Sequence, residues 1–172
     1  MTGLRPDGLD IYDLRTFFRT KAPDVVTMSQ YFKQQGYQSE GMGKIYHTGH
    51  GNKNDSLSWS VPHWYPHQLI NQRDPIQSGD TTHMHTSYPK IGGKNLPWYN
   101  SRLPEDLHND VMVTTHALER MDALKGKTFF LAVGMVKPHL PFVAPSKYWD
   151  LYDPASITVP APDKPDVFPT YA

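Results

Sequence analysis

The 172-residue chain contains no cysteine, no excess charge of either sign and no long apolar run, and each absence excludes a class of protein or site. Without cysteine, these residues form no disulfide, no cysteine-based zinc site and no thiol nucleophile. The 17 basic residues balance the 17 acidic ones, so the chain lacks the charge that generic binding to nucleic acid or to an anionic membrane requires. No apolar run approaches the ~18 residues of a membrane helix. We therefore expect neither a nucleic-acid partner nor a membrane span.

Two segments carry clear secondary-structure patterns. In the first, Thr27 and Gln30 fit a capping box and Gly36 fits a helix stop, which predicts a short helix of about nine residues. Residues 37–43 then predict a short strand whose last residues include glycine. Glycines at a strand end let backbone or ligand approach closely, so this strand end is a candidate for function.

The second segment opens at Pro104, Glu105 and Asp106, which suit the first turn of a helix. A stripe at helical spacing continues this predicted helix over about 18 residues, to a stop at Gly126. The stripe consists of Val111, Thr115, Leu118, Met121 and Leu124. Residues 128–134 are continuously apolar, which is typical of a strand buried on both faces. A helix followed at once by such a strand predicts an α/β fold with helices packed on a mostly parallel sheet.

The rest of the chain shows little periodicity. Residues 48–103 are rich in Gly, Pro, Asn and Ser, which predicts an irregular, insertion-like loop region or a hairpin that periodicity does not reveal. Residues 143–172 form a proline-rich segment, which predicts a chain that runs extended over a surface, with helix confined to residues 146–152.

Each predicted strand is followed by a lysine and a histidine. Lys44 and His47 follow the first strand, and Lys137 and His139 follow the second. Strand ends are where ligands bind in open α/β sheets; lysine donates to sulfate or phosphate oxygens, and histidine moves a proton near neutral pH. The pattern predicts an anion site, although unrelated surface residues would give the same spacing.

Most of the other histidines lie in the irregular middle region and invite a metal hypothesis. Pairs at short spacing are His47 and His50, His63 and His67, and His83 and His85. Pro62 and Pro66 oppose a shared helical face for the second pair, and no cysteine is available to complete a zinc site. We therefore expect solvated loop histidines and no metal ligand in this chain.

Aromatic residues are also frequent in the middle region. They either stack on a sugar or anchor the loops to the fold, and the sequence favours neither reading. The residues concerned are Trp59, Trp64, Tyr65, Trp98 and Tyr99.

Three stretches resemble the sulfatase family, in the family's own order. Residues 36–47 resemble the second sulfatase signature, Gly-Tyr-x-Ser/Thr followed by Gly-Lys-x-x-His. Residues 1–7, Met-Thr-Gly-Leu-Arg-Pro-Asp, resemble the stretch that follows the first signature, Cys-x-Pro-Ser-Arg. Residues 129–142 are similar to the third, basic segment, and the whole order best resembles the iduronate-2-sulfatase branch. The resemblance implies an alkaline-phosphatase-like α/β fold, present in part.

The resemblance also implies an activity, that of a sulfuric ester hydrolase acting on a sulfated sugar. Lys44 would contact a formylglycine nucleophile and a sulfate oxygen, and His47 would hydrogen-bond the formylglycine hydroxyl and act as a base. His139 would contact the ester oxygen and help to protonate the leaving alkoxide, with Lys137 as a further substrate-binding cation. Lys44 and His139 would thus serve both binding and catalysis.

Two cofactor-related features of the family are not found in these residues. The formylglycine, formed from Cys or Ser, would lie about eight residues before Met1 by the motif spacing, and the calcium ligands belong to other segments of the family. We therefore expect residues 1–172 to be an internal part of the catalytic domain, inactive alone. Family members are exported or lysosomal, and the first residues show no export signal.

Two alternatives remain open at this stage. A relative in the same superfamily would hydrolyse a phosphodiester or a phosphonate monoester with the same fold. A non-catalytic fragment would use the basic residues only to hold an anion or a sugar.

Overall fold

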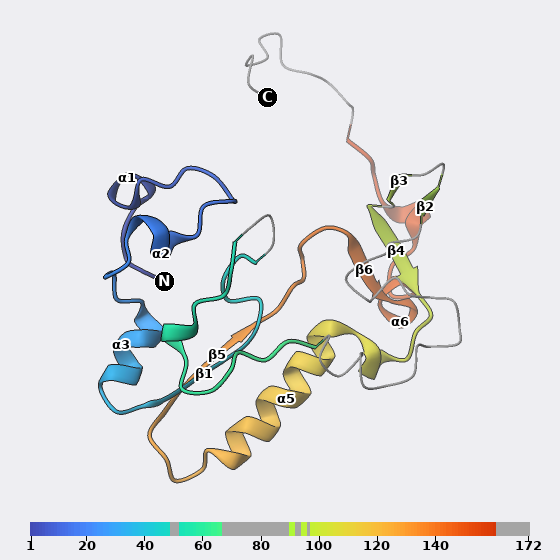
Figure 1. The fold of residues 1–172 in the computed structure, drawn as a ribbon. Coiled ribbons are helices and arrows are strands. Elements are labelled where there is room, and N and C mark those ends of the chain that lie inside the picture. The colour runs from blue at the N-terminus through green and yellow to red at the C-terminus, as the bar shows by residue number, and fades with distance from the viewer. Residues whose placement is uncertain (49–51, 67–89, 92–93, 96, 161–172) are drawn as a thin grey trace.

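The computed structural model describes residues 1–48, 52–66, 90–91, 94–95 and 97–160 (Figure 1). In chain order the elements are α1 (Pro6–Leu9), α2 (Phe18–Lys21), α3 (Met28–Gln34), β1 (Gln38–Gly43), β2 (Lys90–Ile91), β3 (Lys94–Asn95), β4 (Trp98–Ser101), α5 (Asn109–Ala123), β5 (Phe129–Gly134), β6 (Phe142–Pro145) and α6 (Ser146–Trp149). Short 3-10 helices occupy Ser56–Ser58, Glu105–Leu107 and Pro154–Ser156. None of the described helices is both long and apolar enough to cross a membrane.

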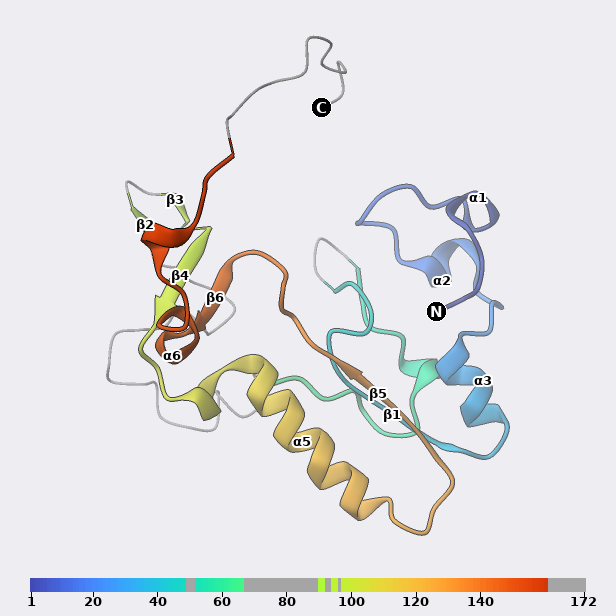
Figure 2. The ribbon, with the colours of Figure 1, turned by 180° about the vertical axis from the view of Figure 1, so that it is seen from behind.

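The centre of the fold is the parallel pair β1 and β5. Their register runs from Gln38 opposite Phe129 to Gly43 opposite Gly134. Helices α3 and α5 lie on opposite sides of this pair in both views (Figures 1 and 2). A second parallel pair joins β4 to β6, and β2 pairs with β3 antiparallel. Parallel strands covered by helices confirm the predicted α/β class.

Helix α3 follows its sequence signals closely. The Thr27 hydroxyl accepts the Gln30 N–H at 3.1 Å, as in a capping box, and Gly36 ends the helix with φ +85. The other half of the box does not form, because the Gln30 side chain accepts a hydrogen bond from Arg19 instead. The predicted helix and the strand after it are therefore confirmed, and the cap is shared with a neighbouring segment.

Helix α5 differs from its prediction in its start. Glu105–Leu107 is a separate 3-10 helix, and His108 is extended, so the α-helix begins at Asn109. The separate turn has a tertiary cause, because the Glu105 carboxylate binds Lys147 and Tyr148 of α6.

The buried face of α5 also differs from the predicted stripe. Leu118 and Met121 are exposed, 59% and 49%, whereas Val113 and Ala117 are buried against Met42 of β1. The short side chains of Val113 and Ala117 let the helix approach the sheet closely. A longer apolar residue at these positions would hold the helix further away.

Strand β5 is less buried than its apolar sequence predicts. Phe130 stacks on Phe32 of α3 at 4.7 Å between ring centroids, and Leu131 packs on the cluster formed by Met42 and α5. Both faces are therefore contacted, but Val133 is still 38% exposed. Within the described part of the chain only β1 pairs with β5, so its other edge is left uncovered.

Part of the middle region runs along the free edge of β1. We call residues 58–65 the strap. Ser60 N–H donates to the Ser39 carbonyl at 2.6 Å, and Trp64 N–H donates to the Gly41 carbonyl at 3.0 Å. The strap thus gives β1 a neighbour on the side away from β5. Within residues 143–172, β6 and α6 are regular elements, and residues 161–172 lie outside the described part.

Candidate functional site

The parallel pairing of β1 and β5 brings the two Lys/His segments to one edge of the sheet. Gly43 lies opposite Gly134, and the Lys44 N–H donates to the Gly134 carbonyl at 2.9 Å. The chain leaves both strands in the same direction at this edge. Lys44, Lys137 and His139 are exposed there, and His47 is half-buried.

Two facing glycines allow the strand ends to meet. Gly43 has φ +68, and a Cβ there would lie 2.1 Å from the Gly134 carbonyl oxygen. A Cβ on Gly134 would lie 2.2 Å from the Lys44 carbonyl oxygen. These distances leave no space for any side chain, so the bases of the two segments touch through backbone alone.

The β1 end is also held by the strap. The Gly43 N–H donates to the Trp64 carbonyl at 3.0 Å, and the His63 Nε2 lies 2.8 Å from the Gly43 carbonyl oxygen. Trp64 in turn stacks on His116 of α5, with 4.2 Å between ring centroids. The β1 end is therefore fixed from the strap side as well as from β5.

The β5 end is held by one carboxylate on α5. Asp110, in the first turn of the helix, accepts the Val136 N–H at 2.8 Å and the Lys137 N–H at 3.0 Å. A carboxylate that accepts two backbone N–H groups fixes both position and direction of the loop. The loop that carries His139 is thus aligned by the N-terminus of the same helix whose other end reaches β1 through Arg120 and Glu40.

Within this loop the two basic side chains bind backbone. The Lys137 ammonium donates to the Pro141 carbonyl at 2.7 Å. Loss of water around this ammonium lowers the pKa of Lys137, and the charge of Asp110 opposes the shift. The His139 Nδ1 lies 2.6 Å from the Leu140 carbonyl, so Nδ1 carries a proton and Nε2 is left to face a ligand.

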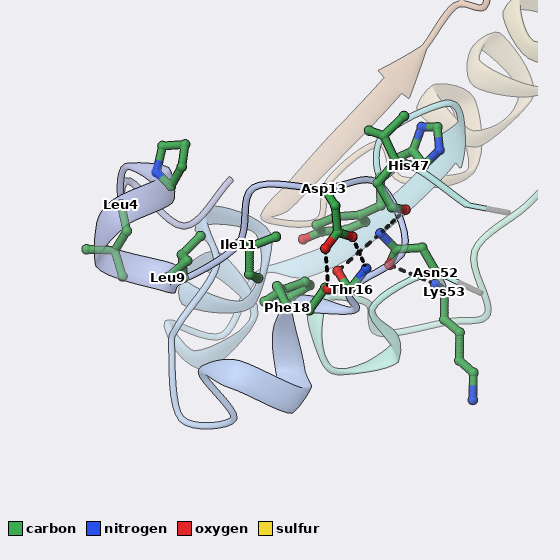
Figure 3. Close-up of a pocket in the computed structure, with 12 residues that line it drawn as sticks. Leu4, Leu9, Ile11, Asp13, Thr16, Phe18, His47, Asn52 and Lys53 are labelled. Atoms are coloured by element: carbon green, nitrogen blue, oxygen red, sulfur yellow. Dashed lines mark hydrogen bonds between the residues drawn. The ribbon is translucent and has the colours of Figure 1, made fainter. Parts of the chain in front are cut away.

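A cavity of about 280 Å³ lies beside His47 (Figure 3). Its wall is mostly apolar, with Leu4, Leu9, Ile11 and Phe18 among the lining residues. Neither Lys44 nor His139 lines it. Of the residues of the predicted anion site, the cavity therefore contains His47, which it brings close to the N-terminal stretch at Leu4 and Pro6.

The metal hypothesis finds no support in the described residues. There, no three His, Asp or Glu side chains gather in an arrangement that could hold a metal ion, and we derive no step through one. Of the predicted histidine pairs, His50, His67, His83 and His85 lie outside the described residues.

The aromatics of the strap anchor it. Trp59 is only 3% exposed, and its indole N–H donates to Asn54 at 3.3 Å. Trp64 stacks on His116, whereas Trp98 of β4 is 55% exposed. The anchoring interpretation therefore applies to Trp59 and Trp64, and the Trp98 ring contacts Trp149 of α6, with 5.5 Å between ring centroids.

Two residues that shape the site were missed by sequence reasoning. Asp110 carries only the generic signal of an acid in the first turn of a helix, and that signal does not name the loop it binds. His63 carried a metal hypothesis, and no local pattern points to the Gly43 carbonyl. Both act across long stretches of sequence, which periodicity cannot reveal.

Comparison with known proteins gives matches that cover between 37% and 100% of this chain. Human iduronate 2-sulfatase is 33% identical over 178 residues, which cover 100% of this chain and 31% of that protein. A sulfatase of Formosa agariphila is 29% identical over 167 residues, covering 93% of this chain and 32% of the relative. A multifunctional alkaline phosphatase superfamily protein, PehA of Trinickia caryophylli, is 37% identical over 67 residues, or 37% of this chain and 13% of the relative.

These matches cover only part of each relative. The chain spans about a third of the length of the curated sulfatases that it matches, 31% for the human protein. No protein-family model matches it. Full-length coverage by relatives named sulfatases, together with the parallel strands and their covering helices, shows that the chain belongs to the sulfatase family, with part of its alkaline-phosphatase-like fold.

Proposed function

We propose that this chain supplies part of the sulfate-binding site of a sulfuric ester hydrolase that removes sulfate from a sulfated sugar. The observation that carries the proposal is the parallel pairing of β1 and β5, which puts Lys44 and His139 after neighbouring strands at one edge of the sheet. The name of a matched relative supports the substrate class, since the human protein is an iduronate 2-sulfatase.

In this proposal the cations act on the sulfate group. The Lys44 ammonium donates to a sulfate oxygen and stabilises the negative charge that develops there as sulfur is attacked. The free Nε2 of His139 faces the ester oxygen and, when the ring is protonated, donates a proton to the departing alkoxide. Lys137, whose ammonium is already bound to the Pro141 carbonyl, adds positive charge to the site.

His47 acts on the nucleophile. The family resemblance implies a formylglycine that attacks sulfur, from a residue outside this chain. The arrangement of this chain supports that role, because the N-terminal stretch at Leu4 and Pro6 lines the same cavity as His47 (Figure 3). His47 would hold and later remove the proton of the nucleophile's hydroxyl. Membership of the family also supports an exported or lysosomal location.

The test uses the full-length protein with the upstream Cys-x-Pro-Ser-Arg present and modified. Lys44→Ala and His139→Ala should each reduce kcat for an aryl sulfate or a sugar sulfate by about 100- to 1,000-fold, because each removes a preorganised donor. Lys125→Ala is the matched control, since its ammonium is exposed and pairs with Asp122 on α5. Wild-type rates in both site variants would contradict the proposal.

The match to the alkaline phosphatase superfamily protein favours a second candidate, hydrolysis of a phosphodiester or a phosphonate monoester. A sulfate monoester and a phosphodiester or phosphonate monoester with the same leaving group separate the two, because the ratio of their kcat/KM values reports which transition state the site stabilises better. The 172 residues alone should show no turnover of either ester; binding without turnover by the full-length protein would favour the non-catalytic alternative.

A further inference from the structure

His63 is a buried side chain to which the proposed chemistry gives no role. It is 6% exposed, and its Nε2 lies 2.8 Å from the Gly43 carbonyl oxygen. A carbonyl only accepts hydrogen bonds, so Nε2 carries the proton and the ring donates. His63 therefore binds the backbone directly before Lys44.

We propose that His63 is a positioning residue for Lys44, which it aims by holding the peptide group that leads into it. The inference rests on the proposed function, in which the Lys44 ammonium binds a sulfate oxygen. His63 touches neither substrate nor nucleophile in this role; it acts only through Lys44.

The argument starts from one peptide unit. The Gly43 carbonyl and the Lys44 N–H belong to the same plane, because the peptide bond is rigid. The N–H donates to Gly134 at 2.9 Å and the carbonyl accepts from His63 at 2.8 Å. Backbone pairing holds one end of the unit and a side chain holds the other, so loss of His63 leaves the plane free to tilt about a single hydrogen bond.

The ring itself is held firmly. It lies 5.3 Å from the Trp59 ring and 4.5 Å from the Tyr65 ring, measured between centroids. Gly41 makes room for it, because a Cβ there would lie 2.7 Å from the His63 Nδ1. A donor packed in this way is preorganised, so it aligns the carbonyl without a large loss of side-chain entropy.

The electrostatic surroundings favour a neutral ring. Burial lowers the pKa of His63, against a smaller opposing effect of the Gly43 carbonyl, and Nδ1 is buried with no hydrogen-bond partner. Protonation of Nδ1 would bury a charge and add an N–H that has no acceptor. The titratable ring in contact with His63 is that of Tyr65, whose pKa is raised by burial.

The test compares three variants of the full-length protein. His63→Phe keeps the ring volume and loses the donor, whereas His63→Gln places an amide N–H near the position of Nε2 without a titrating group. Trp149→Phe is the matched control, because it removes another aromatic N–H that donates to a strand carbonyl, that of Ala144 at 3.2 Å. The readouts are kcat for a sulfate ester and the exchange rate of the Lys44 amide hydrogen.

His63→Phe should lower kcat by about 10- to 100-fold, the usual cost of a misplaced catalytic group, and speed exchange at Lys44. His63→Gln should restore most of the activity, and Trp149→Phe should change neither quantity. Unchanged kcat and exchange in His63→Phe would overturn the proposal, as would equal losses in Trp149→Phe. If the wild-type protein turns over no sulfate ester but His63→Phe still speeds exchange at Lys44, the positioning role stands and the proposed function is refuted.

Discussion

The ends of β1 and β5 carry similar residues but are held in different ways. The β1 end lies between two neighbours, β5 and the strap, and its last carbonyl is bound by a buried histidine. The β5 end leaves the sheet as an exposed loop, and the two amides at its start bind a single carboxylate, that of Asp110. The lysine that follows β1 is therefore supported by the core, whereas the histidine that follows β5 is supported through a single carboxylate.

Helix α5 contacts both strands. Its first turn supplies Asp110 to the β5 loop, and its last turn supplies Arg120 to Glu40 of β1. The helix therefore has two structural roles, one at each end: its first turn holds the β5 loop and its last turn holds β1. Substitutions that act on one support should leave the other measurable.

The largest expected loss of stability comes from a substitution at the point where the two strand ends meet. Gly43→Ala adds a Cβ 2.1 Å from the Gly134 carbonyl at φ +68, so we expect a loss of unfolding free energy of about 3 kcal/mol or more. Gly126→Ala is the control, with φ +78 and no atom near its Cβ, and should cost about 1 kcal/mol. Urea unfolding followed by tryptophan fluorescence measures both. Equal costs would show that the strand ends do not need their close approach.

The next effect tests how α5 holds β1. Glu40 is 2% exposed and binds Arg120 at 2.7 and 2.8 Å, so Glu40→Gln should cost about 2 kcal/mol. The exposed Asp122–Lys125 pair provides the control, and Asp122→Asn should change stability by less than about 0.5 kcal/mol.

This ion pair also predicts a pH dependence. The hydrogen bonds from Arg120 lower the pKa of Glu40 below its usual 4.5. Its stabilising effect is therefore complete above that value and is lost as the pH falls through the lower pKa of the folded state. The wild type should lose more stability than Glu40→Gln between neutral and acid pH. Parallel pH profiles would contradict this assignment.

The smallest expected loss of stability comes from a substitution that tests whether the two strand ends are held independently. Asp110→Asn keeps one acceptor oxygen and loses the charge, so the β5 loop should loosen at a cost of about 1 kcal/mol. The amides of Val136 and Lys137 should exchange faster, with Lys44 unchanged and kcat about tenfold lower. Asp106→Asn, at an exposed site in the preceding turn, is the control. Equal acceleration at Lys44 would show that the two supports are not separate.

The sequence predicts the parts of the fold that local signals specify. The cap at Thr27 and the apolar run of β5 predicted α3 and the second strand, and the pairing of β1 with β5 agrees with the predicted parallel sheet. The predicted start of α5 was wrong because Glu105 binds α6, about 40 positions away in the chain. A signal in the first turn cannot encode such a partner.

For the site, the sequence predicted the basic side chains but not the contacts that hold them in place. Lys44, His47, Lys137 and His139 stood out by spacing and by resemblance, and their catalytic roles stay predictions. Their supports did not stand out, because the contact of His63 with Gly43 spans 20 positions and depends on the path of the strap. Parallel pairing of the four-residue strands β4 and β6 was invisible for the same reason.

The facing glycines at the strand ends have a consequence for redesign of the site. The floor beneath Lys44 consists of main-chain atoms from Gly43 and Gly134, and neither position accepts a side chain. Its shape therefore cannot be tuned by exchange of residues. A library that varies the proposed ligand specificity should leave these two positions fixed and place its diversity in the loops above them, where a new side chain changes the walls of the site without moving its base.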